Sequence, residues 1–225
     1  MSGSTGAARG LVIFDCDGVL VDSVAIDIRE LTRTIARLGG TMSEHEVLAA
    51  FDGAALADID RALTAHLGAP PPADWMQDWF AARTVAFEQD LTAVAGAAQA
   101  VDGVRALGWE ICVASQGEPG KMAQTLRVSG LARLFLPERI FSATMVARGK
   151  PAPDLFLHAA AVCGYAPEAC VVVEDSVPGV TAGRAAGMRT FGYANGDAAH
   201  AARLAELGAE PLHALQDLPE LLAPT

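Results

Sequence analysis

Short apolar runs alternate with longer stretches of helical periodicity along this chain. Turn-forming or charged residues bound each run, and the runs cover residues 11–14, 111–114, 139–141, 171–173 and 188–193. Runs of strand length separated by amphipathic helices are typical of a parallel sheet whose two faces are covered by helices. The pattern therefore predicts an α/β fold.

The segment from residue 24 to residue 92 departs from this alternation, because no run in it predicts a strand. Its hydrophobic positions follow the helical period in four stretches, which begin near residues 24, 43, 56 and 75. Ser43 and Glu46 have the spacing of a capping box at the start of the second stretch. Four helices in a row exceed an ordinary crossover between strands. We therefore expect an inserted α-helical cap at 24–92 and an α/β core formed by residues 1–23 and 93–225.

Composition and charge narrow the class of protein. Just over half of the 225 residues are hydrophobic, which is ample for a large core and excludes a disordered chain. The net charge of −11 argues against a nucleic-acid partner, because such binding depends on Lys and Arg that neutralise phosphates. The apolar runs are of strand length and are interrupted by charges or glycines, so we expect no membrane span.

Three features of the sequence indicate the cellular compartment: the cysteines, the histidines and the first ten residues. The four cysteines form no C-x-x-C pair, and the five histidines lack the short spacings of a zinc site. The opening MSGSTGAARG is small and polar, which predicts a flexible leader and not a signal peptide. We expect a reduced cytoplasmic protein, and the sequence leaves open whether it is a monomer or a small homo-oligomer.

Chemically capable side chains follow three of the predicted strands. Asp15 follows the first run, Ser115 follows the second, and Glu174 and Asp175 follow the fourth. In an open α/β sheet the carboxyl ends of the strands line the ligand crevice. Groups from distant parts of the chain should therefore meet at one edge of the sheet, and this convergence favours a catalytic or binding site.

Carboxylates are concentrated near the end of the first run. Asp15 and Asp17 are separated by one residue, and carboxylates so close repel each other unless a cation offsets their charge. This spacing allows one carboxylate to meet an electrophile while the other faces the leaving group. Asp175, from another strand, would complete a Mg²⁺ site, because hard cations prefer oxygen ligands. Asp22, with Ser23, is assigned instead to the start of the first cap helix.

Only two lysines, Lys121 and Lys150, occur among the sixteen basic residues. Lys150 lies in the restricted loop GKPAPD, where it could hold a phosphoryl oxygen and the attacking carboxylate together, although taken alone it is better explained as a surface lysine. Ser115 precedes Gln116 and a helix that starts near Pro119, and a hydroxyl with free backbone N–H groups suits a phosphate oxygen. An ordinary N-cap serine is the better explanation of Ser115 when it is taken alone. Lys121 has no such support and is predicted to be solvated.

Four stretches carry a resemblance to a known family. The stretches FDCDGVLVDS, VASQG, RGKPAPDLF and VVVEDSVPGV resemble, in order and spacing, the four motifs of the haloacid dehalogenase superfamily. The likeness covers roughly residues 10–195 and looks closest to the sugar-phosphate phosphatase branch, which includes 6-phosphogluconate phosphatases and β-phosphoglucomutases. It implies a Rossmann-like parallel sheet with a small α-helical cap.

The resemblance also implies a role for each matching residue. Asp15 would be the nucleophile that forms an aspartyl-phosphate, and Asp17 would be the general acid and then the general base. Mg²⁺ would be held by the Asp15 carboxylate, the Asp17 backbone carbonyl and Asp175, with Glu174 nearby or acting through water. The phosphoryl group would be held by Ser115, Gln116 and Lys150.

These residues distinguish among four candidate functions. A sugar phosphomutase is similar to the phosphatases, but Asp27 and Leu56 stand where the mutases carry a histidine and an arginine in the cap. A carbon–halogen hydrolase would not need Asp17, since halide leaves without a proton. A receiver-type phosphoacceptor module needs neither a cap nor the D-x-D spacing. The sequence therefore favours a Mg²⁺-dependent phosphatase of a small phosphorylated sugar or sugar acid, such as 6-phosphogluconate.

Overall fold

The computed structural model describes residues 8–51 and 56–223. Most of the predicted leader lies outside this range, and so does the side chain of Leu56. The chain divides into two compact units: a sheet unit, Met1–Val21 with Ala93–Thr225, and a helical unit, Asp22–Thr92. These limits fall within two residues of the division predicted between core and cap.

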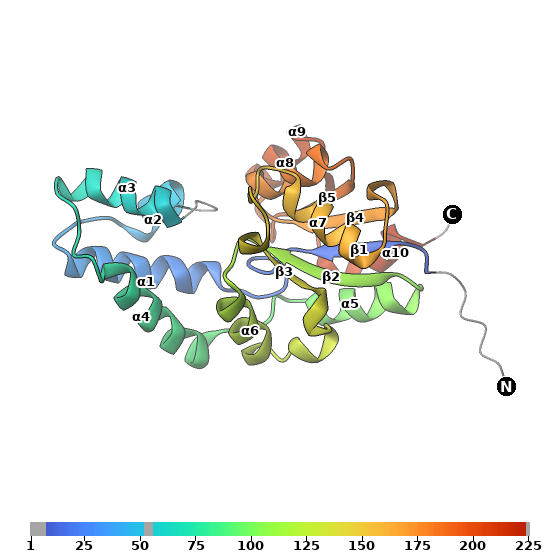
Figure 1. The fold of residues 1–225 in the computed structure, drawn as a ribbon, viewed down its shortest axis with the longest axis horizontal. Coiled ribbons are helices and arrows are strands. Elements are labelled where there is room, and N and C mark those ends of the chain that lie inside the picture. The colour runs from blue at the N-terminus through green and yellow to red at the C-terminus, as the bar shows by residue number, and fades with distance from the viewer. Residues whose placement is uncertain (1–7, 52–55, 224–225) are drawn as a thin grey trace. The chain divides into compact units, whose positions relative to one another are not determined.

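The sheet unit contains a parallel sheet, as the apolar runs predict, and the α/β fold class is confirmed. Its strand order is β3-β2-β1-β4-β5-β6 (Figure 1). In the described part of the chain the strands are β1 Leu11–Phe14, β2 Glu110–Ser115, β3 Ile140–Ser142, β4 Cys170–Glu174, β5 Arg189–Tyr193 and β6 Glu210–Leu212. The edge strand β6 was not predicted, because its three residues Glu-Pro-Leu are too few to show a pattern.

Helices cover both faces of this sheet. In Figure 1, α7 and α8 lie on one side of the sheet, and α5 and α6 lie on the other. The α-helices of the unit are α5 Ala97–Ala106, α6 Pro119–Val128, α7 Asp154–Cys163, α8 Val177–Ala185, α9 Ala198–Glu206 and α10 Leu218–Leu221. Short 3-10 helices occupy Ala132–Leu134, Pro137–Arg139, Ala143–Met145, Pro167–Ala169 and Leu215–Asp217.

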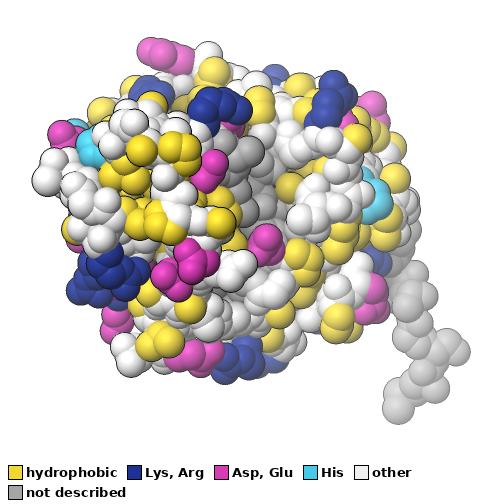
Figure 2. Space-filling view, turned by 60° about the vertical axis from the view of Figure 1, so that its left-hand side comes forward, with side chains coloured by type: hydrophobic (Ala, Val, Ile, Leu, Met, Phe, Trp, Pro, Cys, Tyr) yellow, Lys and Arg dark blue, Asp and Glu magenta, His cyan; other side chains and the backbone are white. Residues whose placement is uncertain are grey.

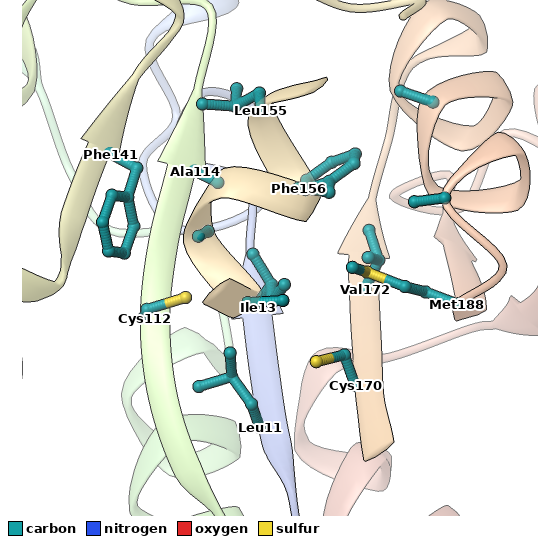
Figure 3. Close-up of a cluster of buried hydrophobic side chains, with 14 residues drawn as sticks. Leu11, Ile13, Cys112, Ala114, Phe141, Leu155, Phe156, Cys170, Val172 and Met188 are labelled. Carbon is teal, nitrogen blue, oxygen red and sulfur yellow. The ribbon is translucent and has the colours of Figure 1, made fainter. Parts of the chain in front are cut away.

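The central strand β1 explains why the first apolar run is continuous. All four of its residues are at most 1% exposed, because β1 is covered on both faces. Figure 3 shows Leu11 and Ile13 between Cys112 on β2 and Cys170 on β4. Phe156 of α7 packs against the same cluster, and each such side chain contributes roughly 1.5–3 kcal/mol when it is fully buried.

Strand register decides which residues share an edge. Phe14, the last residue of β1, is paired with Val113 on β2 and with Val173 on β4. Because these strands are parallel, the residues that follow each of them emerge at the same edge of the sheet. Asp15, Ser115 and Glu174 are therefore brought to one edge.

The helical unit consists of α1 Val24–Arg37, α2 Glu44–Phe51, α3 Leu56–Leu67 and α4 Trp75–Asp90. It has its own core, in which the rings of Trp75 and Trp79 are stacked with centroids 6.1 Å apart. The predicted capping box is present, since Ser43 N donates to the Glu46 carboxylate at 2.8 Å and Glu46 N donates to Ser43 Oγ at 3.3 Å. Ser23 is the N-cap residue of α1, but its side chain makes no capping hydrogen bond.

Two features of the described residues bear on partners. None of their helices combines the length and the apolar character needed to cross a bilayer. On the face drawn in Figure 2, Lys and Arg side chains are dispersed and interleaved with Asp and Glu. The absence of a nucleic-acid partner stays a prediction from the net charge.

Candidate active site

Asp15 lies at the carboxyl edge of the sheet and continues its pairing by one residue. Its N–H donates to the carbonyl of Val173 at 2.9 Å, which fixes the backbone of Asp15 against β4. Asp15 is 6% exposed, and Ser115, at the end of the neighbouring strand, is 1% exposed. The two predicted site residues are therefore buried polar groups at adjacent strand ends.

Lys150 is buried and lies against Asp15. It is therefore not the surface lysine that its loop, taken alone, would suggest. Its side chain is 2% exposed, and Nζ donates to the carboxylates of Asp15 and Glu174. Nζ also donates to the carbonyl of Ala114 at 3.0 Å. These contacts hold an ammonium group directly beside the carboxylate that was predicted to be the nucleophile.

Glu174 connects Lys150 to the start of α8. One of its oxygens accepts from Lys150, and the other accepts the N–H groups of Asp175 and Ser176 at 3.1 Å each. Ser176 Oγ in turn accepts from Gly179 N at 3.0 Å, as the N-cap of α8. Both oxygens of Glu174 are thus engaged by the protein, and its predicted metal role through water remains a prediction.

The loop after β2 is fixed by side chains on both sides. Gly117 N donates to Ser115 Oγ at 3.1 Å, and Ser142 Oγ donates to the Gly117 carbonyl at 2.8 Å. Gln116 accepts from Lys150 N at 3.0 Å, so its amide positions the lysine loop. The N-cap residue of α6 is Glu118, which excludes the simpler N-cap reading of Ser115.

Lys121 contacts Asp17, and the prediction that it is solvated is wrong. Its Nζ lies 3.0 Å from Asp17 Oδ1, and the two side chains are 12% and 21% exposed. The contact arises because the first turn of α6 begins directly after the loop that follows Ser115. Helical periodicity gives no signal of such a contact with a distant segment, although the scarcity of lysine had marked the position.

Burial and like charges oppose ionisation of Asp15. Burial raises the pKa of Asp15, and the nearby Glu174 and Asp17 raise it further, against the lowering effect of Lys150. For Lys150, burial by itself lowers the pKa, but the carboxylates of Asp15 and Glu174 outweigh it and the net direction is upward. A further cation beside Asp15 would therefore favour the ionised form that a nucleophile needs.

The residues fit a divalent cation by donor type and by charge. Asp175 reaches the turn after Asp17, since a Cβ at Gly18 would lie 1.9 Å from Asp175 Oδ2. When all are ionised, the carboxylates of Asp15, Asp17, Glu174 and Asp175 outnumber the ammonium groups of Lys121 and Lys150 by two.

No three His, Cys, Asp or Glu side chains form a metal-binding group within residues 8–51 and 56–223. The predicted Mg²⁺ ligands are the side chains of Asp15 and Asp175 and the main-chain carbonyl of Asp17, with Glu174 nearby or acting through water. Such a set would not form a cluster of three side chains. The metal therefore remains a prediction that rests on oxygen donors and excess charge.

Sequence reasoning missed two further residues at this edge of the sheet. His200 of α9 contacts the carbonyl of Asp175 through Nε2. Gly179 accommodates the Glu174 carboxylate, because a Cβ there would lie 1.9–2.2 Å from its carboxyl atoms. Gly179 lies in the motif VVVEDSVPGV, but the motif alone gives no sign of the contact, and His200 lies in no motif. Both contacts depend on how α8 and α9 pack.

A buried lysine between carboxylates at the carboxyl edge of a parallel sheet defines a candidate hydrolase site. The family model described as haloacid dehalogenase-like hydrolase matches residues 10–187. The chain belongs to this family, as its four motifs predict.

Two named enzymes are similar to this chain in sequence. The chain is 32% identical over 181 residues to a 6-phosphogluconate phosphatase of Escherichia coli strain K12, with 80% of each chain covered. It is 37% identical over 132 residues to a β-phosphoglucomutase of Mycobacterium tuberculosis, with 56% of this chain and 48% of the relative covered.

A solved structure extends the likeness over almost the whole chain. A crystal structure of a haloacid dehalogenase family hydrolase from Deinococcus radiodurans R1, described with bound phosphate and sodium, is 34% identical to this chain. The TM-score is 0.78, and the match covers 98% of this chain and 100% of that one.

Proposed function

We propose that this protein is a Mg²⁺-dependent phosphatase that hydrolyses a small phosphorylated sugar or sugar acid, such as 6-phosphogluconate. The observation that carries the proposal is the buried contact of Lys150 with Asp15, beside Asp17 at the same sheet edge. The similarity to a 6-phosphogluconate phosphatase supports the substrate class. The phosphate in the Deinococcus relative supports a phosphoryl ligand.

In this proposal Asp15 attacks phosphorus, and its oxygen forms a bond to phosphorus as the bond to the leaving oxygen breaks. Asp17 gives its proton to the leaving oxygen, which departs as the free alcohol. Asp17 then takes a proton from the water that attacks phosphorus, so that phosphate leaves and Asp15 is restored. Apart from these bond and proton transfers, catalysis consists mainly of positioning and charge neutralisation, as is usual in phosphoryl transfer.

Buried cations and donors would hold the phosphoryl group. Lys150 would neutralise both Asp15 and a phosphoryl oxygen, and its own position depends on Glu174 and Gln116. Ser115 would donate its hydroxyl proton to a second oxygen. Mg²⁺, when bound by Asp15, Asp175 and the carbonyl of Asp17, would supply further neutralisation of the charge on the phosphoryl group.

The helical unit would act as the cap of the site. Caps of this kind exclude water and add contacts to the substrate. We further propose that the protein acts in the cytoplasm on a free metabolite, as its cysteine usage and acidic composition suggest.

A sugar phosphomutase is the second candidate, because a β-phosphoglucomutase is among the relatives. Two residues of the helical unit favour hydrolysis. Asp27, whose carboxylate lies 3.5 Å from Arg83, stands where the mutases carry a histidine, and Leu56 stands where they carry an arginine. A mutase would need such cap groups to hold its second phosphate.

A phosphate-release assay over a panel of phosphorylated sugars and sugar acids tests the proposal. We expect release with Mg²⁺, loss of release with excess EDTA, and loss of at least about 1,000-fold in kcat for Asp15→Asn, since removal of the nucleophile blocks the covalent route. Circular dichroism checks that this variant is folded. Isomerised sugar phosphates without free phosphate would favour the mutase, and wild-type turnover by Asp15→Asn would overturn the nucleophile.

A further inference from the structure

The ion pair between Lys121 and Asp17 joins the first turn of α6 to the turn after β1. The two side chains are 12% and 21% exposed, so water screens this pair less than it screens a pair on an open surface. Lys121 is held in place by its helix, because the next residue, Met122, is 1% exposed and packs into the core. The ammonium group is therefore presented to Asp17 from a rigid element.

The second oxygen of Asp17 faces the loop after β2. A Cβ at Gly117 would lie 3.4 Å from Asp17 Oδ2 and 3.5 Å from Ser115 Oγ. The turn that carries Asp17 is itself closed by the hydrogen bond from Gly18 N to the Val21 carbonyl at 2.9 Å. One oxygen of the carboxylate thus meets Lys121, and the other lies near Gly117, in the loop after Ser115.

We propose that Lys121 is a positioning residue that orients the Asp17 side chain, which gives its proton to the leaving oxygen as the carboxylic acid and then, as the carboxylate, takes a proton from the attacking water. The inference rests on the proposed phosphatase function. General acid catalysis contributes about 10²–10⁴-fold to the reaction rate. An Asp17 side chain turned away from the leaving oxygen would lose part of this rate enhancement. Lys121 itself forms no bond to the reacting atoms in this proposal.

The dependence of rate on the leaving group separates this role from simple attraction of phosphate. A sugar alkoxide is a strong base and must be protonated as it leaves. The phenolate of p-nitrophenyl phosphate is a weak base and leaves without a proton donor. Misorientation of Asp17 should therefore slow the sugar phosphate more than the aryl phosphate, whereas loss of a phosphate-binding charge should affect both alike.

The experiment compares kcat and KM on both substrates for wild type, Lys121→Met and Lys121→Arg. For Lys121→Met we expect kcat to fall about tenfold or more on the sugar phosphate and by less than about threefold on p-nitrophenyl phosphate. Lys121→Arg should recover part of the loss, because it retains a cation. Arg105→Met, which removes an exposed cation of α5, is the matched control and should leave both rates unchanged.

Equal losses on the two substrates, or no loss, would overturn the role of Lys121 while leaving the phosphatase intact. No release from any substrate by the wild type would instead overturn the proposed function, and the role of Lys121 with it. If Lys121→Met does not fold, Lys121→Gln takes its place. A crystal structure of the wild type with Lys121 directed into solvent would overturn the proposal without reference to activity.

Discussion

At the scale of single residues, burial decides what each charged group does. Lys150 and Glu174 are paired with side chains 2% and 0% exposed, and neither can regain water when its partner is removed. A buried ion pair contributes little net stability, but a single charge left behind is costly. The pair therefore serves mainly to hold Lys150 against Asp15.

Glu174→Ala should lower the free energy of unfolding by about 3–5 kcal/mol, because Lys150 would stay buried with one partner fewer. Glu168→Ala is the control, since Glu168 is exposed and lies just before the same strand. Its effect should stay within about 0.5 kcal/mol. Urea denaturation measures both variants, and an equal effect in the two would contradict the structural role of Glu174.

Cys163 offers a residue-scale test of pH dependence. A hydrogen bond from Cys112 lowers the pKa of Cys163 to about 7, with help from Arg139 and against the effect of partial burial. Burial instead raises the pKa of Cys170 to about 11. The thiolate of Cys163 is the form present above its pKa, so its reactivity should rise as pH increases through about 7 and then level off.

Iodoacetamide labelling followed by peptide mass spectrometry measures this directly. Cys163 should react before Cys112 and Cys170, which are at most 1% exposed. Cys163→Ser should remove the fast phase. Labelling of Cys163 that continues to rise up to about pH 9, the ordinary thiol range, would contradict the lowered pKa.

At the scale of elements, two helices that follow strands differ in how tightly they approach the site. α8 begins beside the Glu174 carboxylate, and its Gly179 leaves no room for a side chain. α6 also has a glycine near its start, Gly120, but a Cβ there would meet nothing within 4 Å. The two glycines therefore form a pair for comparison. Gly179 lies against the Glu174 carboxylate, and Gly120 has space for a methyl group.

Gly179→Ala should lower the free energy of unfolding by about 1–3 kcal/mol, because the added methyl group overlaps Glu174. Gly120→Ala should be neutral or stabilise by up to about 1 kcal/mol, since alanine favours the helix. Thermal unfolding followed by circular dichroism measures both. A stabilising Gly179→Ala would show that the helix start can move away from Glu174.

At the scale of the whole molecule, the proposed Mg²⁺ site joins segments that are far apart in sequence. Asp15 follows β1, and Asp175 follows β4, which is its neighbour in the sheet. A ligand that binds only the folded chain raises its stability by mass action. The metal should therefore stabilise the protein as a whole.

Millimolar Mg²⁺ should raise the melting temperature of the wild type and have a smaller effect on Asp175→Asn. Asp102→Asn, which removes an exposed carboxylate of α5, should respond like the wild type. Differential scanning fluorimetry measures the shifts without any assay of activity. An equal shift in all three proteins would argue against Asp175 as a ligand.

The sequence by itself determined the α/β class, the family and the group of residues around Asp15, because strand length, helical period and the four motifs are local patterns. It missed β6, whose three residues are too few for a pattern, and it placed Lys121 in solvent. Only the tertiary structure decided that Lys121 meets Asp17 and that Glu174 holds Lys150. Those contacts join segments that are adjacent only after the strands have paired, so no local pattern encodes them.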